Sequence, residues 1–146
     1  MLSENLILLR TLKGYSQEQV AEKIEISRQA YAKWEKGETI PDVDKCNKLA
    51  LLYNTTIDNL LNAEGYGGDV IMPPTPKGKY IWGTVSISER GQIVIPKTAR
   101  DHFNLKPGDR MVVLGSDGEG IALAPVEIFE KNIEYLMTKG KEHVDK

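Results

Sequence analysis

The chain has 146 residues, which is enough for one average domain or for two small ones. With 40% hydrophobic and 27% charged residues it can form a packed core, which excludes bulk disorder. Its formal net charge of −2 excludes a uniformly basic nucleic-acid coat, but a DNA reader with one basic face fits this balance. The single cysteine, Cys46, excludes an intramolecular disulfide.

The same sequence predicts a cellular location. No apolar run approaches the roughly 18 residues that a membrane span requires. The first residues lack the basic start and the small-residue cleavage site of a signal peptide. One lone cysteine fits a reducing compartment. We therefore expect a cytoplasmic protein that does not associate with a membrane.

Helical periodicity runs through residues 1–62. Ser16, Ser27, Asp42 and Thr56 are residues that favour helix starts, and Gly14 favours a helix end. The pattern predicts helices near residues 2–12, 16–24 and 27–36, with a fourth after Asp42 and a fifth after Thr56. The expected core residues are Leu2, Leu6, Leu9, Leu12, Val20, Ala21, Ile24, Ala30, Tyr31, Trp34, Cys46, Leu49, Ala50, Tyr53, Ile57, Leu60 and Leu61.

The second and third of these helices have the spacing of a helix-turn-helix. The turn between residues 24 and 27 is too short for antiparallel packing, so the third helix is presented to a groove of DNA. The runs Gly14–Ile24 and Ser27–Gly37, followed by Pro41, resemble the Cro/repressor-type (Xre) helix-turn-helix family over residues 1–62. The resemblance implies double-stranded DNA as a partner. The DNA-binding residues that it implies are Gln17, Ser27, Arg28, Gln29 and Lys33.

Elementary chemistry agrees with these assignments. An arginine such as Arg28 can form two hydrogen bonds with guanine, and a glutamine such as Gln29 can do the same with adenine. Glu25 departs from the family, which usually has glycine in the turn. A left-handed backbone at Glu25 would cost about 1 kcal/mol, and the carboxylate would weaken the attraction to DNA.

Residues 63–83 contain five glycines and three prolines, a composition that excludes a helix and predicts a linker. A flexible linker of this length has a root-mean-square span of about 25 Å. Two such linkers leaving one dimer would cover the spacing of about 34 Å between half-sites on DNA. This interpretation predicts tolerance of variable half-site spacing.

Alternating polarity in residues 84–125 predicts a small β module. Strands are expected at residues 84–88 and 92–95, a short helix at 97–103 after Pro96, and strands at 110–114 and 121–124 joined by a glycine-rich loop. About 42 residues lie near the size below which a domain needs a disulfide, a metal or a partner copy. With one cysteine and no metal cluster in the sequence, oligomerisation is the remaining solution.

This module resembles the AbrB/MazE-like swapped-hairpin family. The residues that carry the resemblance are Val85, Ile87, Gly91–Pro96, Arg100, Phe103, Leu105 and Pro107–Asp109. The resemblance implies an intertwined homodimer through residues 84–125, in a family whose members bind either DNA or a toxin. Two interpretations stay open: a dimerisation module, or a second DNA contact through Arg90, Lys97 and Arg100.

Residues 126–146 form the predicted tail. Val126, Phe129, Ile133 and Leu136 are spaced as in an amphipathic helix that ends before Gly140. Such a helix would pack on its own dimer or, alternatively, bind a partner protein.

The expected fold is therefore an all-α, five-helix helix-turn-helix domain (1–62), a linker (63–83), a small mainly-β swapped-hairpin dimer domain (84–125) and a helical tail. The sequence contains no GxxxxGK[ST], GxGxxG, HExxH or GxSxG motif, so we expect no enzyme activity, cofactor or metal. The expected function is a sequence-specific, homodimeric transcriptional regulator, with repression as the favoured mode. Two alternatives are an antitoxin that also regulates its own operon, and a helix-turn-helix used for protein binding.

Overall fold

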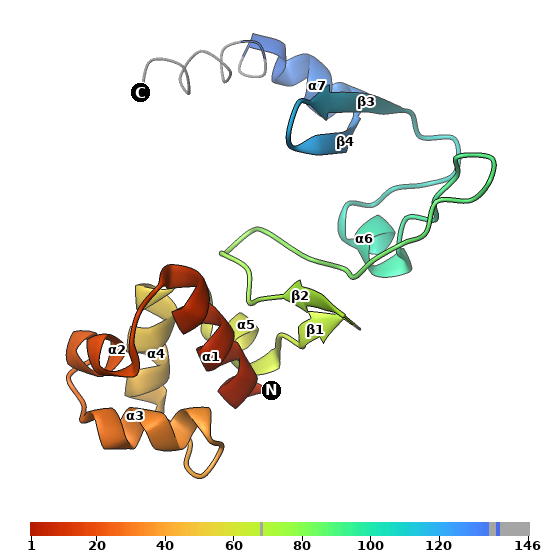
Figure 1. Cartoon of the computed structure of the whole chain (residues 1–146). Coiled ribbons are helices and arrows are strands. Elements are labelled where there is room, and N and C mark those ends of the chain that lie inside the picture. The colour runs from red at the N-terminus through yellow and green to blue at the C-terminus, as the bar shows by residue number, and fades with distance from the viewer. Residues whose placement is uncertain (68, 135–136, 138–146) are drawn as a thin grey trace. The chain divides into compact units, whose positions relative to one another are not determined.

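The computed structural model describes residues 1–67, 69–134 and 137. The chain divides into two units, one from Met1 to Val94 and a second that begins at Ile95, and each is described by itself. Figure 1 shows the helices α1 to α5 and the strands β1 and β2 in the first unit, and the helices α6 and α7 with the strands β3 and β4 in the second. Within the described ranges, no helix is long and apolar enough to cross a membrane.

Five helices open the first unit: α1 (Leu2–Lys13), α2 (Gln17–Lys23), α3 (Arg28–Glu35), α4 (Val43–Leu52) and α5 (Ile57–Asn62). All four predicted N-caps are present. The side chains of Ser16, Ser27, Asp42 and Thr56 each accept a hydrogen bond from the backbone amide three residues ahead. Gly14 ends α1 in the left-handed conformation, at φ 71°. These local signals confirm the predicted helices.

One hydrophobic core joins the five helices. Its buried members are Leu6, Leu9, Val20, Ala21, Ile24, Tyr31, Trp34, Leu49, Tyr53 and Leu60. Two core predictions are wrong, because Leu12 is 60% exposed and Leu61 is 41% exposed. Leu12 lies in the last turn of α1. The six-residue helix α5 buries one side, which Leu60 occupies, and leaves Leu61 outside.

Residues 63–83 differ from the predicted linker. Strands β1 (Gly65–Gly67) and β2 (Val70–Met72) form an antiparallel hairpin, and β1 lies beside α1. Further on, the backbone oxygen of Thr75 accepts hydrogen bonds from Thr55 Oγ1 at 2.6 Å and from Asn59 Nδ2 at 2.8 Å. Glycine and proline excluded a helix, as predicted, but they also suit a tight hairpin and an extended segment held by side chains. We call residues 63–83 the connector. Its hairpin and Thr75 are held against the helical domain.

The strands predicted at residues 84–88 and 92–95 are absent from the single chain. Only the turn between them forms: the amide of Gly91 donates to the Ser88 oxygen and that of Ser88 to the Gln92 oxygen, both at 2.9 Å. Outside this turn the segment is extended and joins no sheet. The side chains of Val85, Ile87, Ile93 and Val94 are all exposed. A strand requires a neighbouring edge, and the single chain offers none to these residues.

The second unit contains α6 (Lys97–His102), β3 (Met111–Ser116), β4 (Gly120–Pro125) and α7 (Val126–Lys131). Strands β3 and β4 pair antiparallel with Val113 opposite Leu123, which confirms the two predicted strands. Helix α7 forms the first part of the predicted tail helix and is followed by a turn at Asn132, whose amide donates to the Phe129 oxygen. Residues 133, 134 and 137 are again helical. Part of the predicted tail, residues 135–136 and 138–146, lies outside the described residues.

Candidate nucleic-acid interface

The turn between α2 and α3 has the geometry of a helix-turn-helix. Glu25 occupies the left-handed region at φ 61°, and the next amide, of Ile26, donates to the Ala21 oxygen at 2.9 Å. Ser27 then begins α3. The Glu25 carboxylate accepts a hydrogen bond from Lys48 Nζ at 3.2 Å. The turn therefore keeps the conformation that favours glycine, although the residue there is glutamate.

The predicted site residues lie on these two helices. Arg28, Gln29 and Lys33 are all exposed on α3. Ser27 is exposed and caps α3, because its Oγ accepts from the amide of Ala30 at 3.1 Å. Its own O–H is still a donor that a phosphate oxygen can accept. Gln17, the first residue of α2, is half-buried.

A polar network beneath the two helices holds Gln17. Its Nε2 donates to Glu35 Oε2 at 2.8 Å. Arg10 donates to the same carboxylate through Nε at 2.6 Å and Nη2 at 3.1 Å, and its Nη1 donates to the Tyr15 oxygen at 3.1 Å. One carboxylate on α3 thus connects α1 and the start of α2.

The network also sets the charge state of Glu35. Burial alone raises the pKa of this carboxyl, but the hydrogen bonds from Arg10 and Gln17 outweigh burial and leave the pKa below its ordinary value. Glu35 is therefore ionised at neutral pH. Sequence analysis missed this network, although one signal was present: Glu35 follows Tyr31 by four residues and so falls on the buried face of α3.

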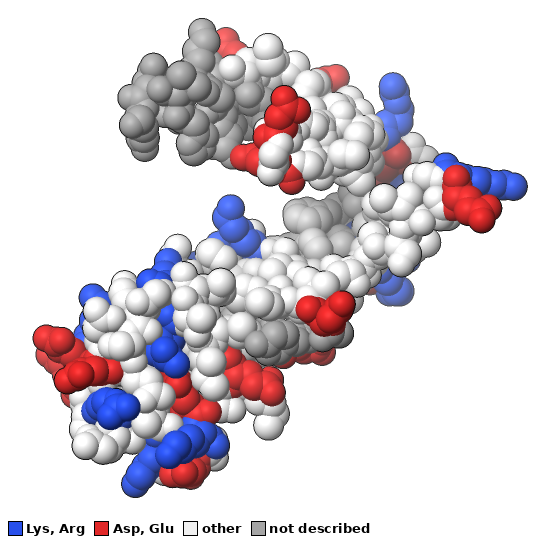
Figure 2. All heavy atoms as spheres, viewed as in Figure 1, with Lys and Arg blue, Asp and Glu red and all other residues white. Residues whose placement is uncertain are grey.

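This pairing leaves α3 with a basic outer surface. The exposed charges from residue 28 to residue 36 are Arg28, Lys33 and Lys36, all positive, since the acidic Glu35 is buried against Arg10. Over the face shown in Figure 2, basic and acidic side chains are interspersed. The chain as a whole has a net charge of −2. The exposed charges of α3, the helix that would enter a groove of DNA, are nevertheless positive.

Two of the three residues in the second set of predicted DNA contacts interact within the chain. Lys97 Nζ forms an ion pair with Asp101 Oδ2 at 2.7 Å, and Arg100 Nε donates to the Ile95 oxygen at 3.1 Å. Arg90 is exposed in the turn before Gly91. No group of three or more His, Cys, Asp and Glu side chains is arranged to hold a metal within the part of the chain that the structure describes.

Known proteins match the two ends of the chain separately. Residues 6–60 match the family model described as helix-turn-helix. Residues 84–130 match the model described as "antidote-toxin recognition MazE, bacterial antitoxin". The first match covers α1 from its second turn through most of α5, and the second covers the β module together with nearly all of α7.

Two curated relatives each match somewhat less than half of the chain. The chain is 40% identical over 62 residues to the HTH-type transcriptional activator BcrR of Enterococcus faecalis, which is 42% of this chain and 30% of BcrR. It is 41% identical over 61 residues to YonR of Bacillus subtilis, an uncharacterised HTH-type transcriptional regulator derived from the SPbeta prophage. That stretch is 42% of this chain and 56% of YonR. The chain therefore spans less than two thirds of either relative.

Among solved structures, a transcriptional regulator from Listeria innocua is similar at 33% identity, over 48% of this chain and 63% of that one, with a TM-score of 0.41. The family models follow the division seen in the sequence and in the fold. The chain joins a helix-turn-helix domain, at residues 6–60, to a MazE-type domain, at residues 84–130.

Proposed function

We propose that this protein is a sequence-specific, DNA-binding transcriptional regulator that acts as a homodimer. The observation that carries the proposal is the surface of α3, a capped helix that exposes Arg28, Gln29 and Lys33. Its one acidic residue, Glu35, is buried in an ion pair with Arg10. The two curated relatives, which match 62 and 61 residues of the chain, are named as HTH-type transcriptional regulators, which supports the same activity here.

The proposed DNA contacts follow from the position of each side chain. Gln17 and Ser27, at the starts of α2 and α3, bind phosphate oxygens, which fixes the orientation of α3. Arg28 and Gln29, in the first turn of α3, read base edges in the major groove. Lys33, one turn further on, binds bases or a neighbouring phosphate.

The proposed homodimer forms through residues 84–125. Val85, Ile87, Ile93 and Val94 expose apolar, β-branched side chains on an extended segment that has no partner strand in the single chain. Paired segments from two copies would supply the missing edges and bury these side chains. A dimer of this kind presents two helix-turn-helix domains to the two halves of a palindromic site.

In vitro selection from genomic fragments tests the proposal. The purified full chain should enrich an inverted repeat, and Arg28→Ala/Gln29→Ala should abolish the enrichment. Lys77→Ala/Asn47→Ala is the matched control. It also removes one positive charge and one side-chain amide, but at exposed positions outside α2 and α3. Enrichment that survives the first double substitution would contradict the assignment of α3 as the reader and would favour Arg90, Lys97 and Arg100.

A second function is supported by the MazE match at residues 84–130. In this alternative the second module and tail neutralise a toxin while the first module represses the operon. The alternative predicts a small reading frame beside the gene whose product is toxic alone and tolerated on coexpression. In either case we propose a non-catalytic, cytoplasmic protein that regulates by repression. Reporter expression with and without the protein tests the sign.

A further inference from the structure

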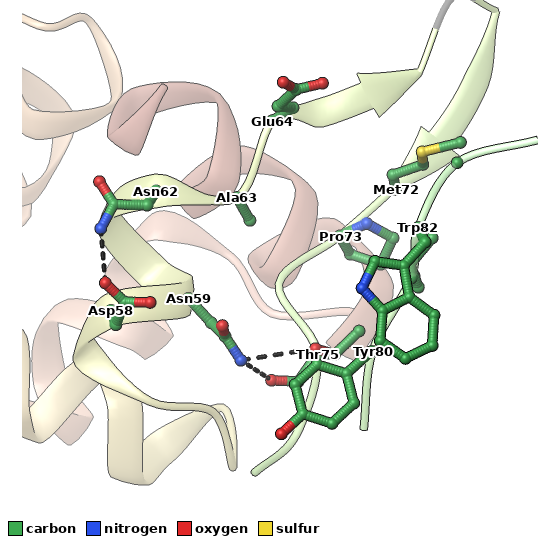
Figure 3. Close-up of a pocket in the computed structure, with 12 residues that line it drawn as sticks. Asp58, Asn59, Asn62, Ala63, Glu64, Met72, Pro73, Thr75, Tyr80 and Trp82 are labelled. Carbon is green, nitrogen blue, oxygen red and sulfur yellow. Dashed lines mark hydrogen bonds between the residues drawn. The ribbon is translucent and has the colours of Figure 1, made fainter. Parts of the chain in front are cut away.

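A cleft of about 440 Å³ lies in the first unit, where the connector crosses α5. Its volume is within the range of small-molecule sites in proteins. In Figure 3, Asn59 on α5 reaches toward Thr75, beside Tyr80 of the connector, while Asp58 and Asn62 on the same helix point toward each other; Tyr80 and Trp82 line the other side of the cleft. The cleft exists because Thr75 is hydrogen-bonded to Asn59, which brings this part of the connector against the helix.

One wall of the cleft is aromatic. The rings of Tyr80 and Trp82 are stacked at 5.2 Å between centroids, with 6° between their planes. Met72 and Pro73 add apolar surface beside them. A stacked pair of this kind offers a flat, electron-rich surface to a planar or cationic group.

The opposite wall is acidic. Asp58 and Glu64 contribute carboxylates, and no Lys, Arg or His lines the cleft. Asn62 Nδ2 donates to Asp58 Oδ1 at 2.7 Å, so one oxygen of Asp58 is already used and the other can accept. Two negative charges with no compensating base among the lining residues favour a positively charged occupant.

From these two walls we infer that the cleft binds a planar organic cation, with its ring against Tyr80 and Trp82 and its charge toward Asp58 and Glu64. The inference is independent of DNA binding, because the site uses neither α2 nor α3. A positively charged ring satisfies both walls at once, whereas an anion would meet two carboxylates and a neutral ring would leave the acidic wall unused.

The test uses 1-methylquinolinium as the cation and neutral quinoline as its matched analogue, with the full-length protein. Titration followed by NMR should shift the indole signal of Trp82 and leave that of the buried Trp34 in place; Trp82→Phe assigns the two signals. Calorimetry should show at least fivefold tighter binding of the cation than of quinoline. Asp58→Asn/Glu64→Gln should reduce the affinity for the cation about tenfold, as expected for the loss of two partly exposed charge contacts.

Glu22→Gln, at an exposed position on α2, is the control and should leave the affinity for the cation unchanged. Tyr80→Ala should weaken binding while the helical content measured by circular dichroism stays constant, because Tyr80 lies outside the hydrophobic core. Equal affinity for the cation and quinoline, or an unchanged affinity in Asp58→Asn/Glu64→Gln, would overturn the inference. A shift confined to Trp34 would also overturn it, because the cation would then bind elsewhere.

Discussion

Gln17 at the start of α2 donates a hydrogen bond of 2.8 Å to Glu35 at the end of α3. A glutamine amide has two N–H groups, so this bond leaves one for a phosphate oxygen. Arg10 donates to both oxygens of the same carboxylate. The position of Gln17, a proposed DNA contact, therefore depends on the ion pair between Arg10 and Glu35, which lies on the buried side of α3.

The first prediction concerns the stability that this pair provides. The Glu35 side chain is 5% exposed and that of Arg10 is 20% exposed. Arg10→Met strands the carboxylate and should lower the free energy of unfolding by about 3 kcal/mol. Arg10→Met/Glu35→Leu removes both charges and should recover more than half of that loss. Urea unfolding followed by the helical signal in circular dichroism measures both values. A double variant no more stable than Arg10→Met would show that packing, and not the stranded charge, causes the loss.

The second prediction is a dependence on pH. The pKa of Glu35 in the folded protein is below its ordinary value, so the folded state favours the ionised form. The resulting stability is fully present above the ordinary pKa of a glutamate, about 4.3, and is lost as the pH falls through the folded value. Thermal unfolding between pH 3 and pH 7 should show this decline. In Glu35→Gln the decline should be smaller, and an identical pH profile would show that other carboxylates cause it.

The third prediction concerns the left-handed turn. Glu25→Gly relieves the strain at φ 61°. It should stabilise the helical domain by about 0.5–1 kcal/mol, because the relieved strain of about 1–2 kcal/mol exceeds the cost of the entropy that glycine adds to the unfolded chain. The exposed ion pair with Lys48 that it removes contributes little. Glu25→Val should destabilise, because a β-branched residue fits this conformation poorly. Thermal melts of the three proteins would rank them, and a Gly variant less stable than the parent would contradict the strain argument.

A fourth prediction tests the exposed extended segment. Ile87 is 75% exposed in the single chain, and Leu51 on α4 is 73% exposed. If copies pair through residues 84–125, Ile87→Asp should convert the dimer to monomer in sedimentation experiments. Leu51→Asp alters an equally exposed apolar residue and should leave the dimer intact. Dissociation by both substitutions, or by neither, would place the interface elsewhere.

The fifth prediction concerns the connector. Thr55 and Asn59 both donate to the Thr75 oxygen, so Thr55→Val/Asn59→Ala should release that part of the chain. With the connector bound, the proposed dimer should prefer one spacing between half-sites. The double variant should bind probes over a wider range of spacings, as measured by gel shift with inserts of different length. Equal tolerance in both proteins would mean that these two hydrogen bonds do not limit the reach of the domains.

The helical domain could be predicted because its determinants are local. Ser16, Ser27 and Asp42 each mark a helix start through a bond to a residue three positions away, which a sequence displays directly. Arg10 and Glu35 are 25 residues apart, and only the packing of α1 against α3 brings them together. The same holds for Thr75, whose partners lie 16 and 20 residues earlier. Alternating polarity at residues 84–95 predicts strands, but a strand also needs a neighbouring edge, and the described part of this chain offers none to these residues.

The bound connector also determines where the first folding unit ends. Asn5, which is buried in α1, donates through Nδ2 to the backbone oxygens of Leu60 and Ala63. Ala63 follows the last residue of α5, so α1 depends on a residue beyond the five helices. A fragment cut at residue 62 would lose the second acceptor, the hairpin beside α1 and the Thr75 contacts. A chimaera that joins this helical domain to another dimerisation module should therefore be spliced beyond Gly83, with the connector transferred as part of the domain that it covers.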